Sequence, residues 1–125
     1  MLQRLRSIHQ AGYIHSDVKP ENIVSGNPDD DRDRETYYLI DLGLATEFLK
    51  GAQHISRGRS SKIAGSFYFM SLNASDGTVQ TRRDDLESLA YTLVYLAKHE
   101  LPWMKYKRSP RTSMKVLNKK VHSMK

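Results

Sequence analysis

A long apolar helix toward the C-terminal end limits the folds that this chain can adopt. The segment DDLESLAYTLVYLAKHE, residues 84–100, begins with acids and is apolar on nearly all sides after them. Acids favour a helix N-terminus, and a helix that is apolar all round is usually buried at the centre of a domain. We therefore predict a central helix that the run Leu-Pro-Trp ends. Its predicted core residues are Tyr91, Leu93, Val94, Leu96 and, at the base of the helix, Trp103.

Shorter elements precede this helix. Leu2, Leu5 and Ile8 fall on one helical stripe, which predicts a helix that Gly12 ends. The runs YIH, NIV and YYLID, starting at residues 13, 22 and 37, are typical of short strands. The polar run 25–36 predicts a turn region between two of them. From about 46 to 84 the chain has frequent Gly and Ser and little periodicity, so we expect an extended, irregular segment.

Composition limits the class of protein. The 125 residues make one domain at most, and no apolar run approaches the roughly 18 residues of a membrane span. There is no signal-peptide core, and zero Cys excludes disulfides and thiolate metal sites, so we expect a cytoplasmic or nuclear protein without membrane contact. Nine Lys or Arg and one acid fall in residues 98–125. Such a basic tail is more often a solvated face than a nucleic-acid site, and we do not expect nucleic acid as a partner.

The loop HSDVKPEN, residues 15–22, holds three groups suited to phosphoryl transfer. That reaction needs a base near the attacking hydroxyl, positive charge near the moving phosphate and oxygen ligands for Mg²⁺. Asp17 can accept the hydroxyl proton, Lys19 points the same way in an extended loop, and Asn22 offers an amide oxygen. Asp41 follows the next strand, and a strand pair would bring it back beside Asn22. A turn or capping role is the ordinary reading of a lone loop Asp, but the set of four favours chemistry.

These residues resemble the catalytic loop of protein kinases. IDLGLA, residues 40–45, resembles their DFG segment with Leu42 in place of Phe. GSFYFMSLN at 65–73 and TRRDDLESLAYTLVYLAKHELPW at 81–103 resemble casein kinase 1 proteins, the second through their central helix. The resemblance runs from Met1 to about Trp103. It implies an α+β, protein-kinase-like fold: a mostly helical C-lobe with short β-hairpins over residues 1–104, an absent N-lobe, and a basic tail or the start of the next helix at 105–125.

The resemblance also implies roles for individual residues. Asp17 is the expected catalytic base, and Lys19 the expected phosphate-facing, cofactor-binding lysine. Asn22 and Asp41 are the expected Mg²⁺ ligands, with ATP and Mg²⁺ as cofactors. Asp85 is expected to accept hydrogen bonds from the backbone near His15 and Ser16. Gly65 and Ser66 are expected where the substrate approaches.

Three departures from the kinase pattern qualify what the resemblance implies. No Lys precedes Lys19, no Glu precedes Glu21 and Gly12 is the only earlier Gly, so the ATP-covering lobe is not in this sequence. Ser16 replaces the usual Arg, so we do not expect control by a phosphate on the activation segment. Tyr68 stands where the family has an Arg that helps recognise acidic or phosphorylated substrates.

Two functions follow as expectations. The first is a casein kinase 1-like serine/threonine kinase that transfers the γ-phosphate of ATP to protein Ser or Thr, present here as a truncated fragment. The alternative is a non-catalytic kinase lobe that acts as a binding or regulatory protein. In either case we expect a partner to cover the surface that would face the N-lobe.

Overall fold

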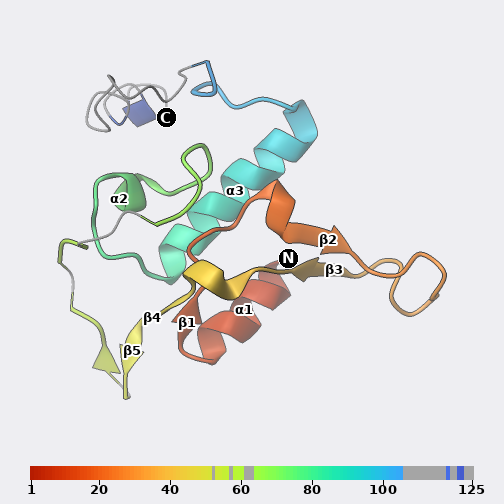
Figure 1. The fold of residues 1–125 in the computed structure, drawn as a ribbon, viewed down its shortest axis with the longest axis horizontal. Coiled ribbons are helices and arrows are strands. Elements are labelled where there is room, and N and C mark those ends of the chain that lie inside the picture. Colours follow the sequence, from red (N-terminus) through yellow and green to blue (C-terminus); the bar gives the residue numbers. More distant parts are fainter. Residues whose placement is uncertain (52, 57, 61–63, 106–117, 119–120, 123–125) are drawn as a thin grey trace.

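A computed structural model describes every residue except 52, 57, 61–63, 106–117, 119–120 and 123–125. The longest helix, α3, crosses the centre of the described chain, with α1 and the short strands gathered along one side of it (Figure 1). None of the described helices is both long and apolar enough to cross a bilayer. The arrangement is α+β, with few helices and short antiparallel strand pairs, as the sequence predicts.

The first helix, α1, spans Leu2–Gln10 and contributes one buried side chain, Leu5. Ile8 is half-buried, whereas Leu2 is exposed. The chain then turns at Gly12, whose φ of +88° lies in the left-handed region that favours glycine. The predicted helix and its end at Gly12 are therefore confirmed.

The described chain has three antiparallel strand pairs, and β1, β2 and β3 are the strands that the sequence predicted. Strand β1, Tyr13–Ile14, pairs with β4, Thr46–Glu47, and β2, Ile23–Ser25, pairs with β3, Tyr37–Leu39. A third pair joins β5, Leu49–Lys50, to β6, Gln53–His54. The segment 46–84 is thus less irregular than expected, because it also contains the short helix α2, Leu72–Ser75. Two-residue strands give too little alternation for a sequence pattern to reveal them.

The central helix α3 spans Arg82–Lys98. Asp84 anchors its first turn by accepting a hydrogen bond from Thr81 N at 2.7 Å, and the positive φ of His99 ends it. Leu89 packs with Leu5 and Val18 in one core cluster. Phe69, Leu101 and Trp103 form a second cluster, so the predicted burial of Trp103 is confirmed. The tail predicted at 105–125 lies mostly outside the described residues, although Asn118 donates to Ser75 O.

The prediction that α3 is buried on all sides is wrong. Leu93, Val94 and Leu96 are 52%, 43% and 48% exposed, and Tyr91 is only partly buried. The buried positions share one face of α3, which contacts α1, the loop 15–18 and the residues at the start of α2: Asp84, Asp85, Ser88, Leu89 and Thr92. In the described structure α3 is therefore covered on one face, and that face is largely polar because it holds the loops around it.

A matched pair of substitutions tests this assignment of faces. Leu89→Ala is expected to lower the free energy of unfolding by about 2–5 kcal/mol, since it opens a cavity in a closed core. Leu93→Ala makes the same change on the same helix and is expected to stay within about 0.5 kcal/mol of the parent. Urea unfolding of both variants measures the difference, and equal losses would show that Leu93 is packed.

Candidate active site

The candidate site is built on the loop between β1 and β2. His15, Ser16 and Asp17 are buried, and the short 3₁₀ helix Pro20–Asn22 returns the chain toward β2 with Asn22 buried at its end. Pro20 suits the first turn of this helix, because its fixed φ is helical and its missing N–H is not needed there. The loop therefore presents Asp17 and Asn22 from a largely buried segment.

Asp17 is the centre of a hydrogen-bonded triangle. Lys19 Nζ lies 2.7 Å from Asp17 Oδ2, and Ser66 N donates to Asp17 Oδ1 at 2.7 Å. Lys19 Nζ also donates to Ser66 Oγ at 3.0 Å. The structure thus brings together Asp17 and Lys19 with Ser66, the residue expected on the substrate side. A carboxylate, a cation and a hydroxyl within one hydrogen-bonded unit can accept a proton and neutralise a nearby anion.

Asn22 also contacts Asp17, one corner of this triangle. Its Nδ2 donates to Asp17 O at 2.9 Å and lies 3.4 Å from Asp17 Oδ2. Because the amide nitrogen is used in this way, the amide oxygen remains as an acceptor that a cation can use.

The strand pair brings Asp41 near Asn22, as predicted. Ile23 is opposite Leu39 in the β2–β3 register, and Ile40 N donates to Asn22 O at 2.9 Å, one residue before Asp41. Asp41 is exposed, has a φ of +65° and accepts a hydrogen bond from Gly43 N. Gly43 leaves room for that contact, since a Cβ there would lie 2.9 Å from Asp41 Oδ1.

The donor set at this point suits Mg²⁺. No cluster of three His, Cys, Asp or Glu able to hold a metal occurs among the residues that the structure describes. Mg²⁺ does not require such a cluster, because it commonly takes one or two protein oxygens and fills its other positions with water and substrate phosphates. The Asp41 carboxylate and the Asn22 amide oxygen fit that requirement.

The environment of Asp17 lowers its pKa. Burial acts to raise it, but the hydrogen bonds from Lys19 and Ser66 together outweigh burial and hold the pKa below the ordinary 3.8. The hydrogen bond to Asp17 is also the main cause that raises the pKa of Lys19. Asp17 is therefore a carboxylate and Lys19 a cation throughout the neutral range, the charge states that proton acceptance and phosphate binding need.

Replacing Lys19 by Met is expected to raise the pKa of Asp17. In the parent chain the lowered pKa contributes stability that is present above pH 3.8 and is lost as the pH falls through the folded-state pKa. Without Lys19 this transition moves to higher pH, which a carbon-13 NMR titration of the Asp17 carboxyl group measures directly. Lys98→Met, at the far end of α3, is the control, and an unchanged Asp17 midpoint in Lys19→Met would contradict the assignment.

Asp85 of α3 holds the loop in place. Its two oxygens accept hydrogen bonds from His15 N at 2.8 Å and Ser16 N at 2.9 Å, as expected. Ser16 adopts a positive φ of 67°, an uncommon conformation for a non-glycine residue, and these hydrogen bonds offset its cost. Asp85 therefore shapes the backbone that carries Asp17.

Two contacts around Asp85 were not predicted. His9 Nε2 lies 2.8 Å from Asp85 Oδ2, so α1 shares the carboxylate with the loop. Thr92 Oγ1, seven residues further along the same face of α3, donates to Val18 O. In each pair the two residues are more than 70 positions apart in the sequence. A lone His or Thr on a helix gives no sign of an acceptor so far away in the chain.

Gly65, where we expect the substrate to approach, lies directly against the backbone of the loop. A Cβ on Gly65 would lie 2.7 Å from Ser16 O, and Gly65 has a φ of +107°, so only glycine fits there. Tyr68, at the position of the expected Arg, packs against the cluster of Phe69, Leu101 and Trp103, and its carbonyl accepts from Trp103 Nε1. This side chain is used in packing, and it offers no positive charge beside Ser66.

One family model and three known proteins are similar to this chain. The family model described as fungal protein kinase matches residues 1–97. A probable casein kinase I homolog of Encephalitozoon cuniculi is 39% identical over 105 residues, which is 83% of this chain and 31% of that protein. Casein kinase 1-like protein HD16 of rice (Oryza sativa subsp. japonica) is 42% identical over 82% of this chain and 15% of its own length. Casein kinase I homolog 2 of Schizosaccharomyces pombe is 36% identical over 82% of this chain and 24% of its own length. The chain thus spans less than a third of each of these relatives.

Proposed function

Because the chain belongs to the fungal protein kinase family, we propose that it carries the catalytic half of a casein kinase 1-like serine/threonine kinase. The relatives named casein kinase support the kinase family and, through it, a protein substrate. The observation that carries the proposal is the hydrogen-bonded triangle of Asp17, Lys19 and Ser66 beside a buried Asn22.

In the proposed reaction each of these groups has one task. Asp17 accepts the proton of the substrate Ser or Thr hydroxyl as the oxygen of that hydroxyl attacks the γ-phosphorus of ATP. The bond from this phosphorus to the β,γ-bridging oxygen breaks, and ADP leaves with its electron pair. Lys19 turns from Asp17 and Ser66 toward the transferred phosphate and offsets its negative charge. Asn22 and Asp41 supply oxygens that would hold Mg²⁺, whose chemistry is to draw negative charge from the phosphate oxygens.

A second candidate function rests on exposed apolar surface near Asp41. Leu42 and Leu44 follow Asp41 in a short 3₁₀ helix and are 57% and 44% exposed. A hollow of about 320 Å³ beside Leu42 is lined also by Ile8, Ala11, Tyr13 and Ala45. Contiguous exposed apolar patches often mark interaction surfaces, so a partner or a further part of a longer protein is proposed to cover this one. A chain that only bound such a partner would be a non-catalytic, regulatory lobe.

Nucleotide binding tests the proposed function. The protein is titrated with ATP in the presence and absence of Mg²⁺, and the affinity is compared with that of Asp41→Asn. Asn also tolerates positive φ, so the backbone is kept while the carboxylate is lost. Affinity is expected to depend on Mg²⁺ and to fall by at least about tenfold in Asp41→Asn, by analogy with the loss of other metal-site groups.

The control is Asp31→Asn, since Asp31 is an exposed carboxylate in the loop between β2 and β3. It is expected to bind Mg·ATP as the parent does. ATP binding that ignores both Mg²⁺ and Asp41 would remove the support for the kinase and favour the regulatory lobe.

A further inference from the structure

A groove of about 340 Å³ lies between α1 and the start of α3. Its volume is within the range of sites that hold ligands. The lining residues of α1 recur at intervals of three and four, so they form one face of that helix, and α3 adds two residues one turn apart. They include Leu2, Leu5, Arg6 and His9 from α1, and Arg82 and Leu86 from α3.

Three leucines supply the apolar part of the groove. Leu5 is buried in the core, whereas Leu2 and Leu86 are 66% and 46% exposed. Exposed leucines on two neighbouring helices form a strip that the apolar side chains of a partner can cover, as in other helix-lined grooves.

The groove also carries unpaired positive charge. Arg6 and Arg82 line it from the two helices, and neither forms an ion pair with a carboxylate of the described residues. The guanidinium carbon of Arg82 lies 4.9 Å from the centre of the buried Phe48 ring, which holds this side chain beside the groove. A guanidinium stacked on a ring keeps its N–H donors at its edges, where a carboxylate can accept two parallel hydrogen bonds.

The acids of the two helices do not neutralise these arginines. Helix α1 contains no Asp or Glu. The three acids of α3 are bound elsewhere: Asp84 at the start of its own helix, Asp85 at the loop that carries Asp17, and Glu87 at Leu72 N of α2. A partner that complements the groove therefore brings its own negative charge.

A second copy of the chain does not meet this requirement. In a two-fold symmetric pair the same surface patch meets itself, so the arginines of one groove would lie near those of the other. Like charges brought together in an interface repel. The charge of the groove thus favours an acidic partner of a different sequence.

We propose that this groove binds an acidic, leucine-containing helical segment of a partner protein. Carboxylates of the segment pair with Arg6 and Arg82, and its leucines cover Leu2 and Leu86. A helix suits the groove, because acids and leucines three or four positions apart lie on one face of it. This binding is separate from phosphoryl transfer and does not depend on it.

His9 connects the groove to the candidate active site. It lines the groove, and its Nε2 lies 2.8 Å from Asp85 Oδ2, while Asp85 also accepts a hydrogen bond from Ser16 N. A segment bound in the groove therefore packs against the residues that support the loop of Asp17.

The test is a binding measurement with a defined peptide. The probe is acetyl-Glu-Leu-Leu-Glu-Glu-Leu-Leu-Glu-amide, labelled with a fluorophore and titrated with the protein while its anisotropy is followed. Saturable binding is expected, with saturable shifts of the backbone amide NMR signals of Arg6 and Leu86. The matched probe has Gln in place of every Glu, which keeps the shape and removes the charge, and it is expected to bind at least about tenfold more weakly.

Variants of the chain assign the site. Arg6→Gln and Leu86→Ala change exposed positions, so they are expected to keep the fold and to weaken binding by about threefold to tenfold each. Arg4→Gln removes the same charge from the same helix, but Arg4 donates to Tyr37 O and does not line the groove. This control is expected to bind the probe as the parent does.

Four results would overturn the proposal. They are equal affinity for the Glu and Gln probes, unchanged binding in both groove variants, an equal loss in Arg4→Gln and Arg6→Gln, and a dimer of the chain in sedimentation that Leu86→Ala dissociates. Each of them leaves the kinase proposal standing, because Mg·ATP binding is measured separately.

Discussion

Asp85→Asn is expected to lower the free energy of unfolding by about 3–5 kcal/mol, the cost of breaking a buried, fully hydrogen-bonded charged group. Asp85 is 1% exposed and accepts hydrogen bonds from His15 N and Ser16 N. The amide that replaces it has one oxygen, so one backbone N–H must face an NH₂ group. The same change alters the contact with His9 Nε2, which lies 2.8 Å from Asp85 Oδ2.

Urea unfolding followed by circular dichroism measures this loss. Asp31→Asn has the same chemistry at a side chain that is 91% exposed, and it is expected to unfold with the parent. A loss below about 1 kcal/mol, the value of one ordinary hydrogen bond, would mean that Asp85 does not hold the loop.

Asp17→Asn is expected to reduce phosphoryl transfer by about 10² to 10⁴-fold, the usual contribution of a general base. The asparagine keeps the size of the side chain and its hydrogen bond from Ser66 N, but it cannot take the proton of the attacking hydroxyl. The loss is expected in kcat, with little change in the affinity for Mg·ATP, because Asn22 and Asp41 are intact.

Steady-state kinetics of the natural-length protein and its Asp17→Asn variant measure this effect. Asp31→Asn again serves as the control and is expected to retain full activity. Near-parental kcat in Asp17→Asn would show that another group accepts the proton. A parallel loss of Mg·ATP binding would show that Asp17 acts in binding the nucleotide.

The local parts of the site were predictable from the sequence. Asp17, Lys19 and Asn22 lie within six residues, so their proximity follows from the loop itself. Asp41 was placed by one further step, because two strands joined by a polar turn must pair antiparallel, and the β2–β3 pair does so. The expected hydrogen bonds of Asp85 came from the family resemblance, and no periodicity would have revealed them.

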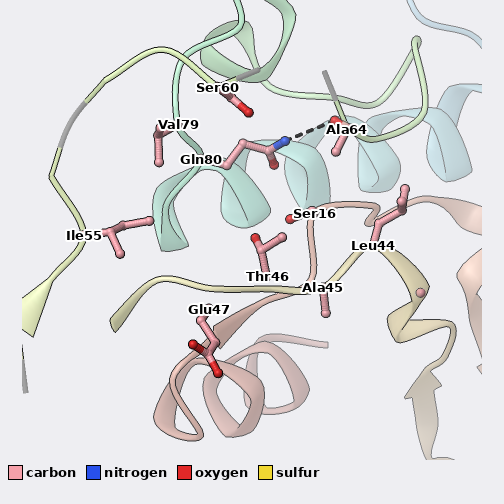
Figure 2. Close-up of a pocket in the computed structure, with 11 residues that line it drawn as sticks. Ser16, Leu44, Ala45, Thr46, Glu47, Ile55, Ser60, Ala64, Val79 and Gln80 are labelled. Carbon is pink, nitrogen blue, oxygen red and sulfur yellow. Dashed lines mark hydrogen bonds between the residues drawn. The ribbon is translucent and has the colours of Figure 1, made fainter. Parts of the chain in front are cut away.

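The other features could not be predicted because they depend on contacts distant in sequence. The composition of α3 is apolar on nearly all sides, and nothing in it distinguishes Leu89, which meets α1, from Leu93, which is exposed. His9 looks like any surface histidine until α1 is packed beside α3 and its ring meets Asp85. A cavity lined by Ser16, Thr46 and Gln80 (Figure 2) is likewise formed by segments that are far apart in the sequence.

The proposed phosphoryl-transfer site can be tested by incubating the protein isolated from its source with Mg²⁺, γ-labelled ATP and a peptide containing one serine. We expect label in that peptide and none in the peptide with alanine at that position. Transfer is expected to be lost when Mg²⁺ is removed. A protein that binds Mg·ATP but transfers no label to any Ser or Thr peptide or protein would contradict this proposal, and the chain would then be a nucleotide-binding lobe without catalysis.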